Sequence, residues 1–503
     1  MADPATVERF RELQRKFSDL WPTLTVRAQP IPRTVVIVHS INLELPPHLL
    51  PVVSAYEERY LALVLLLLRQ PAGRVIHVTS QPLLPQLAQY YFGLMPKLIR
   101  PSSWDRFVPV SVSDGGPGPL TQKLLDRPLT IERIRSHIPD PDWAYIVPFS
   151  VGPRERELAV RLGIPIYGTD PDLSWMGTKS GSRRMFAEAG VPHPAGVEDV
   201  HSIGDVVEAI AQIRSRKPDV AAVMVKVNEA AGGIGNGVLD LRGADDRAVV
   251  EKRVRAVALD DPDGSRDAFF DQLARTGGIV EERLAGEEVT SPSVQIRIAP
   301  DGVAEVLSTH DQILGGATGQ MFLGARFPAD PGYAAEIARH ALAIASRLAD
   351  AGALGRFGID FVCTRNGGGM WDVNAIEINL RNGGTTHPFL TLSALCDGTY
   401  DAETGTFTGS DGRRKFYVAS DHLESEAYKR LTPDDVLDTI EERDLGWDVE
   451  RCTGYAFHLI SAVAVAGRLG LTAIADSPAE AQQMSQRAEA TFDEISAASQ
   501  PAR

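Results

Sequence analysis

Three things are scarce in this chain of 503 residues: cysteine, long apolar runs and net positive charge. Cys363, Cys396 and Cys452 have neither the spacing of a metal site nor the pattern of a disulfide framework, so we expect a reducing, cytoplasmic setting. The most apolar run, residues 61–68, is too short for a bilayer span of about 20 residues. A net charge of −15 argues against nucleic acid or an anionic membrane as a partner.

The chain is otherwise an ordinary globular sequence, with 44% hydrophobic and 23% charged residues, and its length predicts two to four domains. Short apolar strands alternate with helical patterns in the N-terminal third, which predicts a parallel, Rossmann-like layer. The expected strands are 34–40, 74–80, 144–149 and 164–167, and the expected helices are 54–69, 83–92 and 153–162. A stretch rich in Gly, Thr and Asp at 397–412 marks a later boundary, before a smaller α/β tail.

The most informative segment is 358–381, where two alternating apolar and polar runs flank a glycine-rich turn and predict a β-hairpin. Strand geometry puts Glu377, Asn379 and Arg381 on one face, and Asp360 can lie opposite them. Carboxylate and amide oxygens suit Mg²⁺ that substrate phosphates also hold. Arg381 adds fixed positive charge for a carboxylate or phosphoryl group. The alternative is a surface hairpin with solvated charges.

A second motif is a buried strand, 223–227, that carries the single cation Lys226 and runs into a glycine-rich loop. The loop glycines include Gly232, Gly233 and Gly235. Glycines allow backbone N–H groups to approach phosphate oxygens, and the following residues alternate like a strand, so we expect a flap over nucleotide phosphates. A dinucleotide fingerprint is excluded because no helix follows, and a Walker A loop because its spacing is absent. A flexible hairpin without a ligand is the alternative.

A third motif, residues 278–289, is a strand that breaks at a short hinge and resumes with acidic residues. A planar base can bind against the backbone of such a hinge while a carboxylate accepts ribose hydroxyls. An acidic stretch is also typical of a solvated surface, so this motif alone is weak.

The order of these motifs resembles the ATP-grasp superfamily over about residues 175–395. The resemblance is carried by Lys179, then Lys226 with its glycine loop, then a Glu-Glu-x-Leu-x-Gly-x-Glu hinge, then Asp…Glu-x-Asn-x-Arg. Flanking segments at 308–316, 322–328 and 454–459 look like the pheganomycin-type peptide ligases.

The resemblance implies an α/β and α+β multidomain fold. We expect an N-terminal Rossmann-like, pre-ATP-grasp domain at 1–174, an ATP-grasp domain at 175–400 and a small C-terminal α/β domain at 401–503. Within the core, it places the glycine flap at 228–240 and the metal hairpin at 356–382.

It also implies the site residues. Those expected to bind ATP are Lys179, Lys226, Gly232, Gly233, Gly235, Glu281, Glu282, Leu284 and Glu288, with Glu287 as the alternative to Glu288 for the ribose. Those expected to ligate Mg²⁺ are Asp360, Glu377 and Asn379. The candidates for stabilising the transition state are Arg297, Arg356 and Arg381. His310 and Asp311, with Arg381, are candidates for the carboxylate-substrate pocket; for the first two, loop-stabilising hydrogen bonds are an equal alternative.

The function implied is ATP-dependent ligation of a small-molecule carboxylate to the amine of an amino acid or peptide, through an acylphosphate, in specialised metabolism. ATP and Mg²⁺ are the expected cofactors, and a homodimer is a possible assembly. The alternatives are the same activation with a thiol or hydroxyl acceptor, and an ATP-binding module without turnover. Because the metal-ligand types and both lysines are present, we favour the enzyme.

Overall fold

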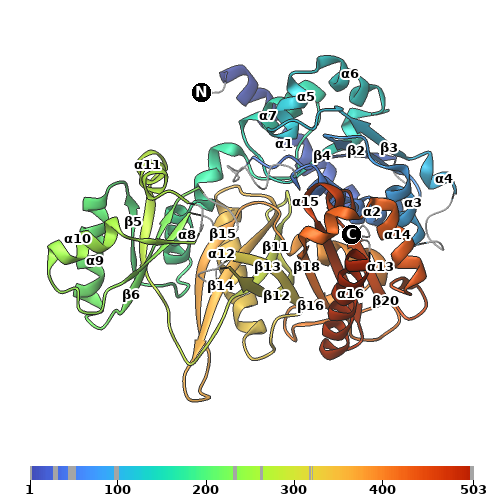
Figure 1. Cartoon of the computed structure of the whole chain (residues 1–503). Coiled ribbons are helices and arrows are strands. Elements are labelled where there is room, and N and C mark those ends of the chain that lie inside the picture. Colours follow the sequence, from blue (N-terminus) through green and yellow to red (C-terminus); the bar gives the residue numbers. More distant parts are fainter. Residues whose placement is uncertain are drawn as a thin grey trace.

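The structure is a computed structural model that describes residues 3–25, 32–42, 52–95, 101–229, 235–260, 264–316, 319 and 321–498. Figure 1 shows a parallel-sheet domain at the top, a lobe around β5 and β6 at the left, and one large sheet through the middle and right. The multidomain α/β and α+β architecture expected from the sequence is confirmed.

The first domain is a four-stranded parallel sheet in the order β3-β2-β1-β4. Its strands are β1 (Arg33–Val38), β2 (Gly73–Thr79), β3 (Phe107–Ser111) and β4 (Ala144–Pro148). Its helices are α1 (Pro4–Thr25), η2 (Ala55–Tyr60), α2 (Leu61–Leu68), α3 (Pro85–Gly93), α4 (Pro101–Trp104), α5 (Leu120–Leu125), α6 (Pro128–Ser136), η3 (Pro141–Trp143) and α7 (Pro153–Leu162). Segment 164–167 forms only an isolated bridge, Ile146 with Ile166, and not the expected strand. β3 was missed because Pro109 interrupts its pattern, which an edge strand tolerates.

The most apolar run of the chain forms α2, and its position explains its composition. It packs against β2 on one side and α13 (Thr386–Cys396) on the other, so apolar side chains are buried around most of the helix. α2 therefore joins the first domain to the rest of the molecule. Within the described residues, no helix is both long and apolar enough to cross a membrane.

The lobe at the left of Figure 1 is a five-stranded antiparallel sheet in the order β5-β9-β6-β7-β8. Its strands are β5 (Gly196–Val200), β6 (Ala222–Val227), β7 (Asn236–Asp240), β8 (Ala258–Leu259) and β9 (Gly278–Glu282). The helices of this part of the chain are η4 (Pro171–Gly177), α8 (Lys179–Glu188), α9 (Ile203–Arg216), α10 (Arg247–Arg255) and α11 (Arg266–Thr276). The apolar faces of α9, α10 and α11 form one core with the sheet.

The large sheet has ten strands, in the order β10-β14-β11-β12-β13-β18-β21-β20-β19, with β15 paired to β14. The strands of its first half are β10 (Glu288–Thr290), β11 (Pro292–Ile298), β12 (Ala304–Gly315), β13 (Met321–Phe327), β14 (Gly355–Arg365) and β15 (Asp372–Asn379). Helix α12 (Ala334–Asp350) packs against β11 and β12 and closes the core on that side. The opposite side of β11, β14 and β15 faces the lobe and the first domain.

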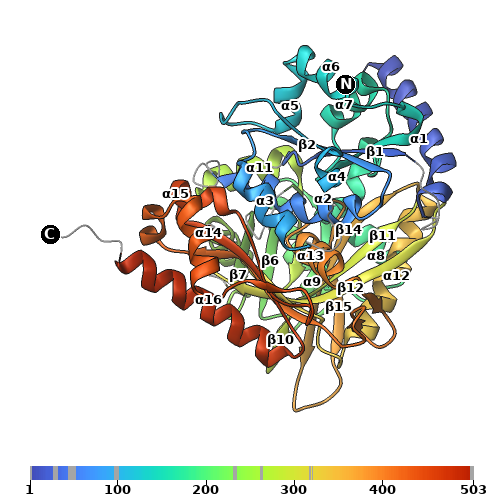
Figure 2. The ribbon, with the colours of Figure 1, turned by 90° about the vertical axis from the view of Figure 1, so that its right-hand side faces the viewer.

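The C-terminal segment extends this sheet, because β13 pairs with its strand β18, and it also contains a separate two-stranded sheet of β16 and β17. Its strands are β16 (Thr399–Asp401), β17 (Thr406–Thr408), β18 (Phe416–Glu424), β19 (Trp447–Asp448), β20 (Thr453–His458) and β21 (Arg468–Ala475). Its helices are η5 (Glu426–Arg430), α14 (Pro433–Glu442), η6 (Ile460–Ala462), α15 (Val463–Ala466) and α16 (Pro478–Ala498). Figure 2 shows α16 lying along the outer side of this segment. The domain limits at 174/175 and 400/401 stay predictions.

Candidate active site

A cavity of about 610 Å³ lies between the five-stranded sheet and the large sheet. Its walls come from α8, β6, the hinge after β9, strands β11 and β12, and the β14–β15 hairpin. The residues expected from the sequence that line it are Lys179, Lys226, Glu281, Glu282, Leu284, Asp360, Glu377, Asn379 and Arg381. Segments that are far apart in the sequence therefore meet in one cavity.

Both lysines are buried in the cavity wall, and each is paired with a carboxylate. Lys179 is the first residue of α8, whose N-cap is Thr178, and its Nζ forms an ion pair with Glu377. Lys226 projects from β6, with its Nζ 2.6 Å from Oε1 of Glu281. Phosphate oxygens entering the cavity can replace these carboxylates as partners of the two ammonium groups.

The hinge begins where β9 ends, and its two glutamates are held by partners within the protein. Glu281 pairs with Lys226 and also with Nη1 of Arg183, at 3.2 Å. Glu282 accepts a hydrogen bond from the backbone N–H of Ala195, at 3.0 Å. Leu284 follows on the cavity wall. These bonds fix the hinge in place beside the cavity.

The acidic group of the site is built by the β14–β15 hairpin. Asp360 is paired directly with Glu377 in the antiparallel register, so their side chains share one face, and a β-bulge follows between Asp360 and Phe361. Asn379 Nδ2 donates to Asp360 Oδ2 at 2.9 Å. Burial, and after it the charge of Glu377, raise the pKa of Asp360 to about 6. Burial acts the same way on Glu377, but the adjacent Lys179 ammonium holds the pKa of Glu377 below its ordinary value.

These three side chains fit a divalent cation. Asp360 and Glu377 face each other in a buried setting, where a cation between them would offset their repulsion. Together with the amide oxygen of Asn379 they form a set of hard oxygen donors, the type that Mg²⁺ prefers. In this structure the Lys179 ammonium group is paired with the Glu377 carboxylate. Glu377 can therefore bind a metal ion only after Lys179 has moved to another anion.

The three arginine candidates do not lie together. Arg381, just after β15, lines the first cavity and also a second cavity of about 700 Å³. Arg297 and Arg356 are register partners on β11 and β14 and line only the second cavity. Arg297 is ion-paired with Glu305. Among these three, Arg381 alone borders both cavities.

Glu288 is not brought to the cavity wall. Its carboxylate lies 2.6 Å from Nη2 of Arg365, where β10 pairs with the end of β14. The alternative, Glu287, accepts a hydrogen bond from the N–H of Gly367 at 2.9 Å and does not line the cavity either. In this structure both glutamates are bonded to the hairpin end, and the ribose contact stays a prediction.

The prediction that His310 and Asp311 line the substrate pocket is wrong. The sequence suggested a loop, but β12 runs continuously through both residues and turns His310 into the core, with its Nε2 2.7 Å from Oη of Tyr417. Asp311 accepts a hydrogen bond from the Tyr333 hydroxyl at 2.7 Å. Neither residue lines either cavity. The alternative, hydrogen bonds that stabilise the local structure, is what the structure shows.

The strands on both sides of the expected flap are present, as β6 and β7, and they pair in register. Gly232 and Gly233 lie outside the described residues. Gly235 is described: its φ of +87° lies in the region that favours glycine, and its carbonyl accepts a hydrogen bond from Val227 N–H at 3.1 Å. The strand β7 then begins at Asn236.

We expect Gly235→Ala to weaken ATP binding. A left-handed backbone costs an L-residue about 1–2 kcal/mol, so the loop would favour another path, with up to about a tenfold rise in Kd. The matched control is Gly243→Ala, because Gly243 also has a positive φ, of +66°, but follows the far end of β7 and lies outside the β6–β7 loop. Calorimetric titration with ATP would check this; equal affinities for the two variants would contradict the flap role.

Sequence reasoning missed a buried polar floor of the cavity. Gln295 on β11 donates from Nε2 to Oγ1 of Thr385 at 2.7 Å and accepts from Oγ1 of Thr386 at 3.0 Å. It also missed Arg183, which pairs with Glu281. The alternation of Ser293, Gln295 and Arg297 with apolar residues in the strand 292–298 was the available signal for Gln295. Nothing in the sequence pattern distinguishes Arg183 from other helical arginines.

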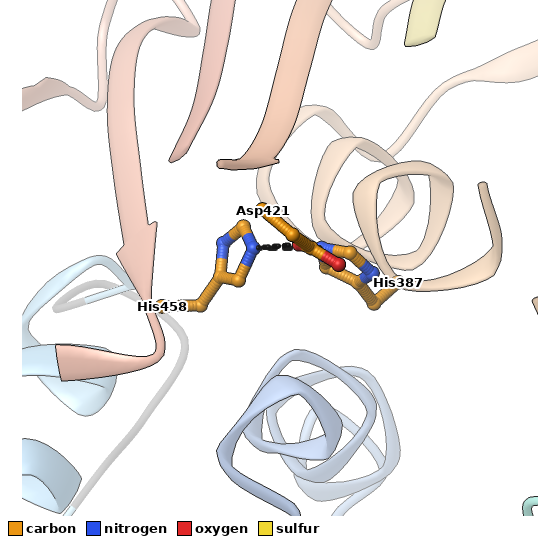
Figure 3. Close-up of side chains that lie close together, drawn as sticks. All are labelled: His387, Asp421 and His458. Carbon is orange, nitrogen blue, oxygen red and sulfur yellow. Dashed lines mark hydrogen bonds and ion pairs between the residues drawn. The ribbon is translucent and has the colours of Figure 1, made fainter. Parts of the chain in front are cut away.

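A second polar cluster lies outside the cavity and joins α13, β18 and β20 (Figure 3). Asp421 Oδ1 lies 2.6 Å from Nε2 of His458 and 3.5 Å from Nε2 of His387. Its Oδ2 lies 2.7 Å from Nη1 of Arg59, on η2 of the first domain. Two imidazoles and a carboxylate could hold a cation, but the Arg59 guanidinium already supplies positive charge there. The cluster therefore fits a structural link between domains.

The comparisons with known proteins agree with this geometry. A family described as IQCH-like, ATP-grasp matches residues 173–261 and 264–402, and the PGM1 C-terminal domain matches residues 435–488. The solved ADP complex of N5-carboxyaminoimidazole ribonucleotide synthetase has a TM-score of 0.52 at 13% identity, over 92% of this chain and 97% of that chain. The biotin carboxylase domain of Hydrogenobacter thermophilus 2-oxoglutarate carboxylase has a TM-score of 0.53 at 12% identity, over 90% and 88%. At these identities they show the fold, which is that of the ATP-grasp enzymes.

Two curated relatives are similar in sequence. L-propargylglycine–L-glutamate ligase of Streptantibioticus cattleyicolor is 32% identical over 434 residues, which are 84% of this chain and 86% of the relative. IQ motif-containing protein H of Danio rerio is 26% identical over 242 residues, 42% of this chain and 23% of that protein. The chain belongs to the family of the first of these, the pheganomycin-type ATP-grasp peptide ligases, and is an ATP-dependent carboxylate–amine ligase.

Proposed function

We propose that this ligase activates a small-molecule carboxylate as an acylphosphate and transfers the acyl group to an amine, with release of ADP and phosphate. One observation carries the proposal: two buried lysines, a facing carboxylate pair and Arg381 line a single cavity. A site of this charge pattern holds nucleotide phosphates on one side and an attacking carboxylate on the other.

ATP would bind with its base against the hinge and its phosphates toward the lysines. Leu284 and Met224 supply apolar wall, and the hinge backbone supplies hydrogen-bonding groups for adenine. Lys179 and Lys226 would exchange their carboxylate partners for phosphate oxygens. The β6–β7 loop would then close over the phosphates and exclude water, which would otherwise hydrolyse the intermediate.

Asp360, Glu377 and Asn379 would hold Mg²⁺, and release of Lys179 to the phosphates would free Glu377 for this role. When bound, Mg²⁺ neutralises charge on the β- and γ-phosphates during transfer. Asn379 orients the Asp360 carboxylate through its amide.

Arg381 would position the acid. Its place between the two cavities lets it contact a carboxylate that enters from the second cavity and meets the γ-phosphorus in the first. The amine then attacks the acyl carbon, phosphate leaves, and the amine loses a proton. Amino acids are the first substrates to test, among them L-glutamate and L-propargylglycine, which the name of the relative specifies. We infer a biosynthetic role in specialised metabolism, in the cytoplasm.

The experiment is an isotope transfer. With ¹⁸O in the acid's carboxylate, we expect one label in inorganic phosphate and ADP as the nucleotide product, because the carboxylate oxygen attacks the γ-phosphorus. Phosphorus NMR or mass spectrometry of the products would check this. Label in AMP would mean an adenylate mechanism and contradict the proposal. Label in phosphate with the acyl group on a thiol or hydroxyl would change only the acceptor.

A further inference from the structure

The second cavity, of about 700 Å³, lies where the first domain meets the large sheet. One wall comes from α1, β1, α2 and β4, and the other from β11, β14 and the segment after β15. Figure 2 shows β1 and α2 beside β11 and β14, in agreement with these lining residues. Arg381 lines both this cavity and the first one, so a molecule bound here would lie next to the nucleotide site proposed above.

The cavity walls combine apolar surface with an excess of positive charge. The aromatic residues that line it are Trp21, Tyr60, Tyr145, Phe149 and Tyr167. Five arginines also line it, against the single carboxylate of Asp397. A neutral or cationic ligand would add no negative charge to these walls. The walls therefore suit a ligand with an apolar body and negatively charged groups.

Ion pairing within the protein accounts for part of this charge. Arg69 pairs with Asp397, and Arg297 pairs with Glu305. Arg356 and Arg381 form no ion pair among the described residues. Burial lowers the pKa of both guanidinium groups, which shows that their charge is partly desolvated. Carboxylates lie near both groups, Glu305 near Arg356 and Glu377 near Arg381, but neither is within ion-pair distance. An anionic ligand in direct contact with the two guanidinium groups would offset the cost of their burial.

One face of β14 lines both cavities, with Gly358 and Asp360 at the first and Arg356 at the second. Alternation puts Arg356, Gly358 and Asp360 on the same face, and four strand residues correspond to about 13 Å between Arg356 and Asp360. Gly358 has no side chain that would separate the two cavities. A Cβ at this position would lie 3.1 Å from Nε2 of Gln295, and larger side chains would project between the two cavities. The acidic group and the arginines therefore lie at opposite ends of one continuous surface.

We propose that the second cavity binds the acid substrate and that this acid is a dicarboxylate with an apolar body. One carboxylate faces Arg381 and the γ-phosphate and is the group activated. The second carboxylate, at the other end of the molecule, pairs with Arg356. This inference rests on the proposed function, because it assumes that the activated group is a carboxylate. L-glutamate, a candidate above, is a small member of the class.

The test separates binding from turnover. Dicarboxylates of increasing length, from malonate to suberate, with phenylsuccinate and L-glutamate, are titrated into the full chain without ATP, each beside the matched compound in which one carboxylate is a carboxamide. We expect at least one dicarboxylate to bind about tenfold more tightly than its amide partner, a difference of about 1.4 kcal/mol, because a charge-assisted bond to Arg356 is lost. Calorimetry and the shift of the thermal unfolding midpoint report it.

Three variants assign the effect. Arg356→Gln should reduce the preference for the dicarboxylate to below about threefold, and Arg356→Lys should retain part of it, since the charge remains. Arg339→Gln, on the exposed face of α12 outside the cavity, removes the same charge and should behave like the parent. Equal binding of acids and amides by the parent, no binding of any dicarboxylate, or an unchanged preference in Arg356→Gln would overturn the inference. Failure of the proposed function is seen separately, as no ADP release with any acid.

Discussion

Glu377→Gln is expected to abolish ligation while leaving the folded protein intact. The substitution keeps the shape of the side chain and its ability to accept a hydrogen bond from Lys179, so packing is preserved. It removes one of the two facing carboxylates that we propose hold Mg²⁺ against the phosphates. Loss of one transition-state charge contact predicts a fall in kcat of about a hundredfold or more, which is about 2.7 kcal/mol in the barrier.

Two measurements distinguish this loss from misfolding. Without ligand, the thermal unfolding midpoint of Glu377→Gln should stay close to that of the parent, because Asp360 remains as a counter-charge for Lys179 and its repulsion by Glu377 is removed. The stabilisation that Mg·ATP gives the parent should be absent. Asp372→Asn is the matched control, because Asp372 is exposed at the start of the same strand, outside the cavity. Parent-like turnover in Glu377→Gln would rule out the metal role.

The sequence predicted those parts of the molecule whose geometry is local. Period-2 alternation placed Asp360 and Glu377 on one face, and the structure pairs them directly. The run 61–68 lies within the helix expected at 54–69, and the structure places it in the buried helix α2. In each case spacing along a single element, or a pair of elements joined by a short turn, determines the arrangement.

What could not be predicted depends on contacts between distant segments. His310 was assigned to a loop beside the substrate because β12 continues further than its pattern indicated. Glu288 was placed at the ribose by counting from the hinge, whereas its partner Arg365 is supplied by the far end of β14. The second cavity forms only when β11 and β14 meet the first domain, so no local pattern indicated that Arg297 and Arg356 line it together.

The buried cluster of His387, Asp421 and His458 in Figure 3 also depends on a contact between distant segments. Its Asp421 binds Arg59, which is 362 residues away in the sequence. Burial alone would raise the pKa of Asp421, but Arg59 and the two histidines hold it well below its ordinary value. The carboxylate is therefore ionised inside the protein, and its charge depends on a guanidinium from another domain. This coupling makes the cluster a sensitive point for the stability of the domain arrangement.

Asp421→Asn is expected to destabilise the chain by about 3–5 kcal/mol, because it leaves the buried Arg59 guanidinium without its counter-charge. Equilibrium urea unfolding at neutral pH, followed by tryptophan fluorescence, measures the effect. Adding Arg59→Gln should cost less than the sum of the two single substitutions, since the pair is then removed as a unit. Glu426→Gln is the control: its partner Lys429 and the pair itself are exposed, and we expect a loss below about 1 kcal/mol. A loss of stability in Asp421→Asn as small as that of the control would mean that the carboxylate is not the counter-ion of Arg59. The link between the first domain and the large sheet would then depend on the apolar contacts of α2 and α13 alone.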